Sequence, residues 1–300
     1  MTTNILAIID PEETEHSALN RIREVPPTAD VAYKVDFYMD AVPVMAGQAS
    51  SGVVKEAIAK HKEWLDELVA PLRSDGYGIT TEVIAFSRLY EEIINSARAF
   101  KADFVFKPVR QHGALRRLFY TSTDWNLVRL CPQPLLMVSD ETAVHGKPVV
   151  AAVDVGDHDE AHKRLNKEVL ERANQLAGVL ESEVHVIYAY GPAAVAGRAG
   201  LSDRLAIEIE RSKYEEELKA TEQLAATHGI KEANIHLREG IPQRVLNEYA
   251  TEVGASVVVI GTVARAGASG LFVGNTAESL LESATTDVFV VKLPEFDAPV

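Results

Sequence analysis

The chain of 300 residues is 47% hydrophobic and 25% charged, proportions typical of a folded protein with room for two domains. Its formal net charge of −14 argues against broad binding to nucleic acids or anionic membranes, whose phosphates attract clustered positive charge. No apolar run approaches the roughly 20 residues of a membrane-spanning helix, the start MTTNILAIID carries no cation, and Cys131 is the only cysteine, so we expect a cytoplasmic protein.

The first half of the chain alternates short apolar runs with segments of helical periodicity, the pattern of βαβ units and a parallel sheet. Helices are predicted at residues 53–73 and 90–100, where apolar side chains recur on one face. A polar stretch at 140–148 is predicted to be a linker. Strands are predicted at residues 4–10, 31–37, 80–86, 103–107 and 135–138.

The second half repeats this order of elements. Helices are predicted at residues 160–180, 202–228 and 242–253. Strands are predicted at residues 149–154, 183–189, 234–237, 256–261 and 288–292. Each half therefore has five predicted strands joined by helical connections.

The late parts of the two halves match at a constant offset of 153 residues. Residues 102–108 (ADFVFKP) fall on 255–261 (ASVVVIG), and residues 118–123 (LFYTST) fall on 271–276 (LFVGNT). Strand-like and loop-like residues agree at this one offset, which indicates an internal duplication.

The opening of each half supports the same conclusion, because both begin with a predicted strand that ends in an acid, Asp10 or Asp154. The sequence predicts an α/β fold of two tandem Rossmann-like domains, at residues 1–142 and 147–300, each with a five-stranded parallel sheet. Homologous single domains usually pair with two-fold symmetry, so we expect an internal pseudo-dimer, with a further homodimer left open.

A glycine-rich stretch at residues 261–281 follows the fourth predicted strand of the second half. Ligands of parallel α/β sheets bind at the carboxyl ends of strands. Asn275 and Thr276 stand where a helix should begin, so open N–H groups and side-chain donors there would suit a phosphate. The alternative is a glycine-rich turn that only lets strand and helix pack closely.

This order of elements, the acid after the first strand and the loop glycines resemble the universal stress protein family. The family loop reads G-x2-G-x9-G-[ST], and the segments LFVGNTAE (271–278) and STDW (122–125) are similar to those of tandem members. The resemblance covers essentially the whole chain. It implies Rossmann-like domains of the adenine-nucleotide alpha-hydrolase type and, in some members, ATP held between the acid and the loop.

By this resemblance, Asp154 corresponds to the acid that contacts the bound nucleoside, and Gly261 and Gly274 to the first and third loop glycines. Ala264 replaces the second glycine with a methyl group near the phosphate, whereas Asn275 replaces a hydroxyl but can still donate a hydrogen bond. The predicted, degenerate ligand site comprises Asp154, Ala189, Ile260, Gly261, Ala264, Arg265, Gly267, Gly274, Asn275 and Thr276.

The first half departs further from the family loop. Pro108 and Gln111 stand at the first two glycine positions and Thr121 at the third, which leaves only Ser122 of the final pair. Proline has no N–H and a fixed φ, so it cannot cradle a phosphate. Asp10 remains, but an acid alone makes no specific site. We therefore predict that the first half has lost nucleotide binding.

Other local patterns are open to two interpretations. The small-residue loops at 39–52 and 191–203 are either flexible connections or a lid over an amphiphilic ligand. The basic loop at 107–117 is either solvated or a contact for an anion or partner. His158 and His162 have the spacing of two metal ligands, but we interpret them as a solvated helix start and predict no metal site.

Three functions are compatible with the sequence. The first is a non-enzymatic stress-response protein that binds a small ligand in the second domain, a protein partner, or both. The second is a weak ATP-binding or ATP-hydrolysing protein, for which Arg265 is the only cation inside the loop. The third is a scaffold with vestigial pockets. ATP or another adenine nucleotide is the candidate cofactor.

Overall fold

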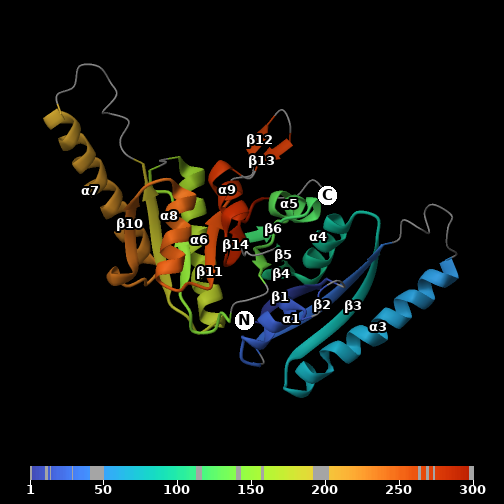
Figure 1. Ribbon diagram of the computed structural model, residues 1–300. Helices are drawn as coiled ribbons and strands as arrows, with labels where there is room; N and C mark the ends of the chain where they lie inside the picture. Colours follow the sequence, from blue (N-terminus) through green and yellow to red (C-terminus); the bar gives the residue numbers. More distant parts are fainter. Residues whose placement is uncertain are drawn as a thin grey trace. The chain divides into compact units, whose positions relative to one another are not determined.

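The computed structural model describes residues 2–10, 13, 15–28, 30–40, 51–112, 117–139, 143–156, 159–191, 203–262, 265–267, 270–272 and 274–296. Residues 1–143 with 294–300 form one compact unit, here domain 1, and residues 144–293 form a second, domain 2 (Figure 1). Within the described ranges, no helix has the length and apolar character needed to cross a lipid bilayer.

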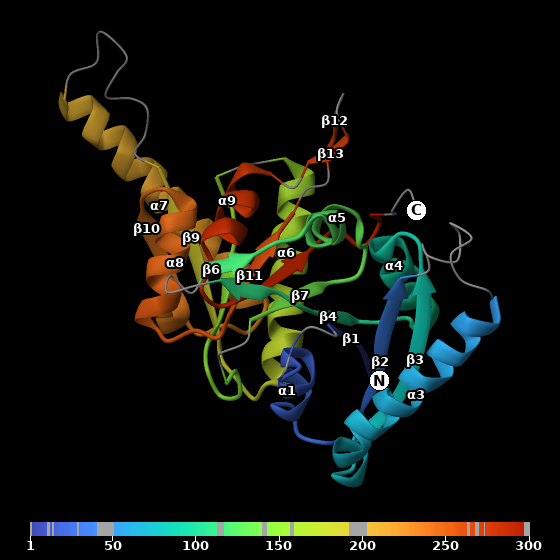
Figure 2. The ribbon, with the colours of Figure 1, turned by 45° about the vertical axis from the view of Figure 1, so that its right-hand side comes forward.

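Domain 1 is built on a parallel sheet with the strand order β3-β2-β1-β4-β7. Every residue of its last two strands is buried, as expected for apolar strands covered on both faces. The strands are β1 (Thr3–Ile9), β2 (Val31–Asp40), β3 (Gly78–Phe86), β4 (Phe104–Pro108) and β7 (Leu135–Val138). The helices are α1 (Ser17–Arg23), α3 (Ser51–Ser74), α4 (Leu89–Phe100) and α5 (Ser122–Leu130), of which α3 lies along β3 (Figure 2).

Domain 2 has the same architecture, with the strand order β10-β9-β8-β11-β14, again all parallel. The strands are β8 (Val149–Ala152), β9 (Val184–Tyr190), β10 (Ile235–Glu239), β11 (Val257–Gly261) and β14 (Asp287–Val291). The helices are α6 (Glu160–Val179), α7 (Asp203–Thr227), α8 (Pro242–Glu252) and α9 (Asn275–Ser283), with a 3-10 turn η1 at Glu232–Asn234. Helix α6 packs on the central strands, and α8 packs on β9, β11 and α9.

Strand registers make the two domains comparable residue by residue. Ile5 of β1 pairs with Phe104 of β4, and Val149 of β8 pairs with Val257 of β11. Phe104 and Val257 are 153 residues apart, as are the first residues of α5 and α9 and those of α4 and α8. The predicted duplication and the tandem parallel α/β fold are therefore confirmed. Pairing of the domains into a pseudo-dimer stays a prediction.

In each domain, a short antiparallel hairpin follows the fourth strand in chain order, and neither hairpin was predicted. In domain 1, β5 (Arg110–His112) pairs with β6 (Arg117–Phe119) inside the predicted basic loop. In domain 2, β12 (Arg265–Gly267) pairs with β13 (Gly270–Phe272) inside the glycine-rich stretch. Most of the small-residue loops at 39–52 and 191–203 and the tip of the basic loop lie outside the described residues.

Candidate functional site

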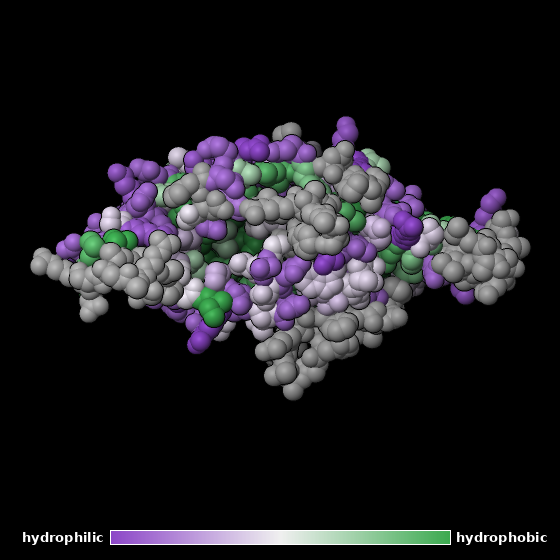
Figure 3. Space-filling view, turned by 90° about the horizontal axis from the view of Figure 1, so that it is seen from above, coloured by the Kyte–Doolittle hydropathy of each residue, from purple (hydrophilic) through white to green (hydrophobic). Residues whose placement is uncertain are grey.

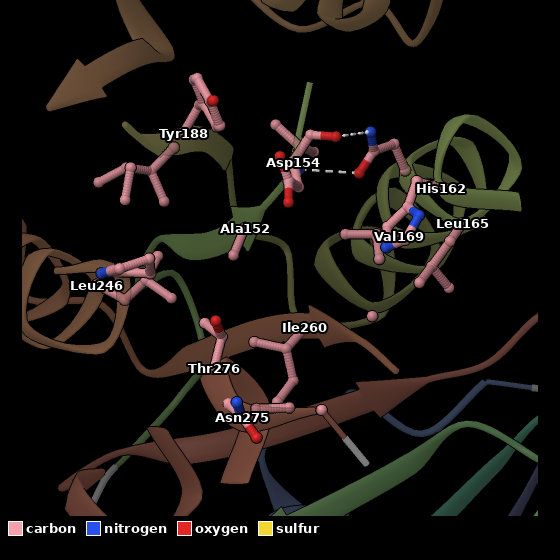
Figure 4. A pocket seen from close by; sticks show the side chains of 18 residues that line it. Ala152, Asp154, His162, Leu165, Val169, Tyr188, Leu246, Ile260, Asn275 and Thr276 are labelled. Carbon is pink, nitrogen blue, oxygen red and sulfur yellow. Dashed lines mark hydrogen bonds between the residues drawn. The ribbon is translucent and has the colours of Figure 1, made fainter. Parts of the chain in front are cut away.

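A cavity of about 330 Å³ lies in domain 2 at the carboxyl ends of its central strands (Figure 4). Viewed from above, a hollow with apolar side chains inside it is visible left of centre (Figure 3). Strands β8, β9 and β11 and helices α6, α8 and α9 all contribute to its wall. This is the place where a parallel α/β sheet is expected to bind ligands.

Most of the residues predicted from the sequence meet at this cavity. Asp154, Ala189, Ile260, Gly261, Gly274, Asn275 and Thr276 all line it. Ala264 lies outside the described residues, whereas Arg265 and Gly267 lie in β12, of which only the backbone is described.

Asp154 follows β8 and presents an exposed carboxylate on one side of the cavity. Its backbone is fixed by Asn166 of α6, which accepts from Asp154 N at 3.0 Å and donates from Nδ2 to Asp154 O at 2.7 Å (Figure 4). The amide of Gly156 donates to Asp154 Oδ1 at 3.1 Å. The carboxylate is thus held as a hydrogen-bond acceptor at the edge of the cavity.

The N-terminus of α9 forms the side of the cavity opposite Asp154 (Figure 4). Its N-cap is Gly274, whose φ of 98° favours glycine and which has no side chain to cap the first turn. Gly274, Asn275 and Thr276 are exposed, so the N–H groups of the first turn face an accessible space. A helix N-terminus of this kind attracts an anion or a polar oxygen.

The floor between these two polar sides is apolar. It is formed by Leu165 and Val169 of α6, Leu246 of α8 and Ile260 of β11, which all line the cavity (Figure 4). A Cβ atom at Gly261 would lie 2.6 Å from Leu165 Cγ, so the glycine allows α6 to approach β11 closely. This contact favours the packing role of Gly261 that the sequence left open, although the residue also lines the cavity.

Three lining residues that bear polar groups were not predicted: His162, Asn166 and Tyr188. His162 Nδ1 lies 2.9 Å from Asp159 Oδ2. The Tyr188 hydroxyl donates to Glu217 of α7 at 3.0 Å, and burial, followed by the charge of Glu217, raises the pKa of Tyr188. Four lining residues lie on one face of α6, namely His162, Leu165, Asn166 and Val169. This helical spacing could have indicated from the sequence that His162 and Asn166 share a wall of the site.

In domain 1 the counterpart of the α9 N-terminus is occupied by a side chain of the protein. Asp124 Oδ2 accepts hydrogen bonds from Thr121 N and Thr121 Oγ1 at 2.7 and 2.8 Å, and Asp124 N donates back to Thr121 Oγ1. This capping box satisfies the first turn of α5. Asp124 Oδ1 lies 3.2 Å from Lys107 Nζ, and both side chains are buried. A carboxylate therefore stands where an anionic ligand would bind.

Of the predicted domain 1 residues, Pro108 and Thr121 contact this internal ion pair. Pro108 is the buried last residue of β4, and its carbonyl oxygen accepts from Lys107 Nζ at 2.7 Å. Thr121 is the N-cap of α5 and Ser122 its first residue, both exposed. Gln111 lies in β5, and Asp10 directly follows β1.

Four positions show how the two domains differ. The registers of β2 and β9 align Asp36 with Ile187 and Tyr38 with Ala189, while the 153-residue offset aligns Lys107 with Ile260 and Asp124 with Ala277. All four domain 2 residues line the cavity. All four domain 1 residues are buried and polar, and Tyr38 donates to Asp36 at 3.2 Å. Bulky, internally paired side chains in domain 1 thus stand where small or apolar ones enclose space in domain 2.

Comparisons with known proteins agree over the full length. The universal stress protein family matches residues 1–139 and 146–292. Universal stress protein E from Salmonella typhi is 29% identical, with 100% of this chain and 97% of that protein covered. The corresponding protein of Escherichia coli K12 is 28% identical with the same coverage.

Solved structures give the same fold. A functionally unknown protein from Pseudomonas aeruginosa PAO1 has a TM-score of 0.77 and 26% identity, covering 98% of this chain and 94% of that one. A universal stress protein from Archaeoglobus fulgidus has a TM-score of 0.66 at 17% identity, covering 96% and 98%. With a family match in each of two domains of one fold, this chain belongs to the universal stress protein family as a tandem member similar to universal stress protein E.

Proposed function

We propose that this protein is a non-enzymatic, cytoplasmic stress-response protein that binds one small ligand in the cavity of domain 2. The observation that carries the proposal is the cavity itself, which has an apolar floor between the Asp154 carboxylate and the N-terminus of α9, whose N-cap Gly274 offers no capping side chain. Ligand sites of proteins are commonly of this kind, with apolar walls and a few placed polar groups. Binding would let the amount of ligand report the state of the cell.

The chemistry of the wall favours a ligand with three parts. An apolar or aromatic body would lie on Leu165, Leu246 and Ile260. A hydroxyl or amine at one end would donate to Asp154, and an anionic or carbonyl group at the other would accept from the first turn of α9. An adenine nucleotide has these parts in this order, so it is the first candidate, as the family resemblance also implies.

Domain 1 is proposed not to bind a nucleotide. Asp124 already caps α5, and its charge would repel a phosphate brought to the same place. We expect one ligand per chain, and a protein partner, if one exists, to use other surfaces.

The first test is mass spectrometry of small molecules released by acid from freshly purified protein. An adenine nucleotide near one per chain is the expected result, and any other compound near one per chain would support the cavity but not the nucleotide. Release of nothing, followed by no detectable ATP binding, would contradict the proposal and favour a scaffold.

A second test compares two equivalent charge changes by titrating ATP into the purified protein. Asn275→Asp adds a carboxylate at the first residue of α9. The carboxylate stabilises the helix by interacting with its dipole, but it repels a phosphate. We expect the affinity for ATP to fall about tenfold, which corresponds to about 1.4 kcal/mol. Ser122→Asp makes the same change at the matching, exposed position of domain 1 and should leave ATP affinity unchanged. Equal effects of the two variants would contradict the assignment to domain 2.

A further inference from the structure

A second polar cluster lies in domain 2, beneath α8, and none of its members lines the cavity. It consists of His185 on β9, His236 on β10 and Tyr249 on α8, here called the histidine cluster. Tyr249 is only 1% exposed, so it is one of the side chains that hold α8 on the sheet. The neighbouring strands place the two imidazole rings side by side under this helix.

The contacts within the histidine cluster suit neutral rings. His185 Nδ1 lies 2.7 Å from the Tyr249 hydroxyl, which can donate to it when the ring is neutral. The two imidazoles are stacked with centroids 5.9 Å apart, and the His236 ring lies 4.7 Å from that of Tyr249. His236 Nε2 is buried and makes no hydrogen bond to any residue that the structure describes. The His236 ring as a whole is half-buried, so a proton on Nε2 would place charge on a buried atom with few partners.

The charged groups around the histidine cluster are mostly committed to other partners. Glu252 forms a two-point ion pair with Arg238 at 2.7 and 2.8 Å, and the Arg238 guanidinium lies 4.6 Å over the Tyr249 ring. Glu183, directly before β9, forms an ion pair with Lys231, and Glu248 of α8 forms one with Arg244 of the same helix. Among the residues that the structure describes, Glu183 favours a proton on His185 and Glu252 favours one on His236, because each is acidic and close to that ring.

The direction of the response to acid follows from burial. Burial lowers the pKa of His185 and of His236, and the positive charges of His185 and Arg238 lower the pKa of His236 further. Burial also raises the pKa of Tyr249 to about 12, so its hydroxyl keeps its proton and offers no negative charge. An unfolded histidine titrates near 6.5. Domain 2 is therefore most stable above that pH and loses stability as the pH falls through the lower folded values.

The same helix joins the histidine cluster to the cavity. Pro242 and Leu246 of α8 line the cavity, and Tyr249 lies one turn after Leu246 on the same helix face. We propose that the histidine cluster is an acid-sensitive latch: protonation of His185 and His236 loosens α8 from the sheet and so opens one wall of the cavity. An acidic cytoplasm would then change ligand occupancy without any change in ligand concentration.

Domain 1 carries a different cluster at the matching place and offers an internal control. The registers and offset align His185 with Lys34, His236 with Glu82 and Tyr249 with Ser96. Lys34 pairs there with Glu82 and with Asp36, whose pKa is raised mainly by burial. Mild acid would relieve a buried charge at this place rather than create one, so α4 should not loosen.

The test is hydrogen exchange of the full chain, without added ligand, at pH 7.5 and pH 5.5, after correction for the intrinsic pH dependence of exchange. In the wild type we expect protection of α8 to fall at least tenfold at the lower pH, while α4 is unchanged. The His185→Gln, His236→Gln double variant should lose most of this fall. His145 lies outside the histidine cluster and its side chain is 44% exposed, so the His145→Gln variant should behave as the wild type. An unchanged α8 in the wild type, or the same fall in the double variant, would overturn the latch.

A second measurement covers the case in which the double variant does not fold. NMR titration of the imidazole resonances in the wild type should give midpoints below 6.5 for His185 and His236, with protection of α8 lost over the same range. A midpoint at or above 6.5 for both rings would overturn the proposal. Since neither measurement uses a ligand, failure of the latch would leave the proposed ligand site untouched.

Discussion

Gly261 combines two roles that sequence reasoning treated as alternatives. It lines the cavity, and it also lets Leu165 of α6 approach β11, because a Cβ atom there would lie 2.6 Å from the leucine side chain. Leu165 itself is 5% exposed and belongs to both the hydrophobic core and the cavity floor. At this residue, the missing side chain serves the packing of α6 and also leaves space in the cavity.

The Gly261→Ala substitution is expected to destabilise domain 2 by about 1–3 kcal/mol, because the added methyl group overpacks the contact with Leu165. Leu165→Ala alone should cost about 2–5 kcal/mol through the cavity it leaves. The double variant should lose less than the sum of the two, by about 1 kcal/mol, since each change relieves the other. Urea unfolding monitored by circular dichroism gives the change in the free energy of unfolding for all three variants. Strict additivity would show that the glycine is not required by Leu165.

Single residues also show how far the sequence could predict the site. Asp154, Gly274 and Asn275 were predicted because the strand-end acid and the loop glycines stand at recognisable spacings, and all three line the cavity. His162 and Tyr188 were missed. His162 shares one face of α6 with Leu165 and Val169, so its helical spacing was a local signal, but which face meets the cavity depends on how α6 packs on the sheet. Tyr188 becomes part of the cavity only through the register of β9 against β8, which no local pattern encodes.

At the scale of elements, α5 and α9 occupy matching positions but differ in how their N-termini are capped. Both helices begin 153 residues apart after matching hairpins, yet α5 has a capping box and α9 has a glycine N-cap. The buried Lys107–Asp124 pair joins the α5 cap to β4. One helix start is therefore closed by a side chain of the protein, whereas no side chain within the described ranges caps the other, which lies beside the cavity.

Asp124→Ala is expected to destabilise domain 1 by about 3–5 kcal/mol, because it removes the cap and leaves the buried Lys107 charge without its partner. The Lys107→Ile, Asp124→Ala double variant introduces the domain 2 residues at both positions and should recover most of this loss. Tryptophan fluorescence follows domain 1 in urea, since Trp64 and Trp125 are the two tryptophans of the chain. A double variant no more stable than Asp124→Ala would contradict the role of the ion pair.

Regular elements were predictable where their residues are buried in a periodic way. The strands β4 and β11 are mostly apolar and almost wholly buried, and α4 and α8 bury one stripe. The hairpins β5/β6 and β12/β13 were missed because each strand has three residues, too few to show alternation. Helix α1 was missed for a similar reason, since its seven residues form barely two turns and include the buried Arg21.

At the scale of the whole molecule, a duplicated fold has two different interiors. Domain 1 fills its crevice positions with Asp36, Tyr38, Lys107 and Asp124, all buried. Domain 2 keeps small or apolar residues at the same positions and encloses a cavity. If domain 1 has lost ligand binding and domain 2 keeps it, as we propose, a family loop that is degenerate to different degrees in the two halves is the expected result.

We expect domain 2, and not domain 1, to hold the ligand, and one measurement compares the two domains directly. Native mass spectrometry of the intact chain gives the mass and number of bound molecules, with ATP added if the protein purifies empty. Ala189→Tyr places the tyrosine of domain 1 at the matching position of the domain 2 cavity and should reduce occupancy at least tenfold. Tyr38→Ala makes the reverse change in domain 1 and should leave occupancy near one per chain. Full occupancy in Ala189→Tyr, or loss of the ligand in Tyr38→Ala alone, would contradict the account.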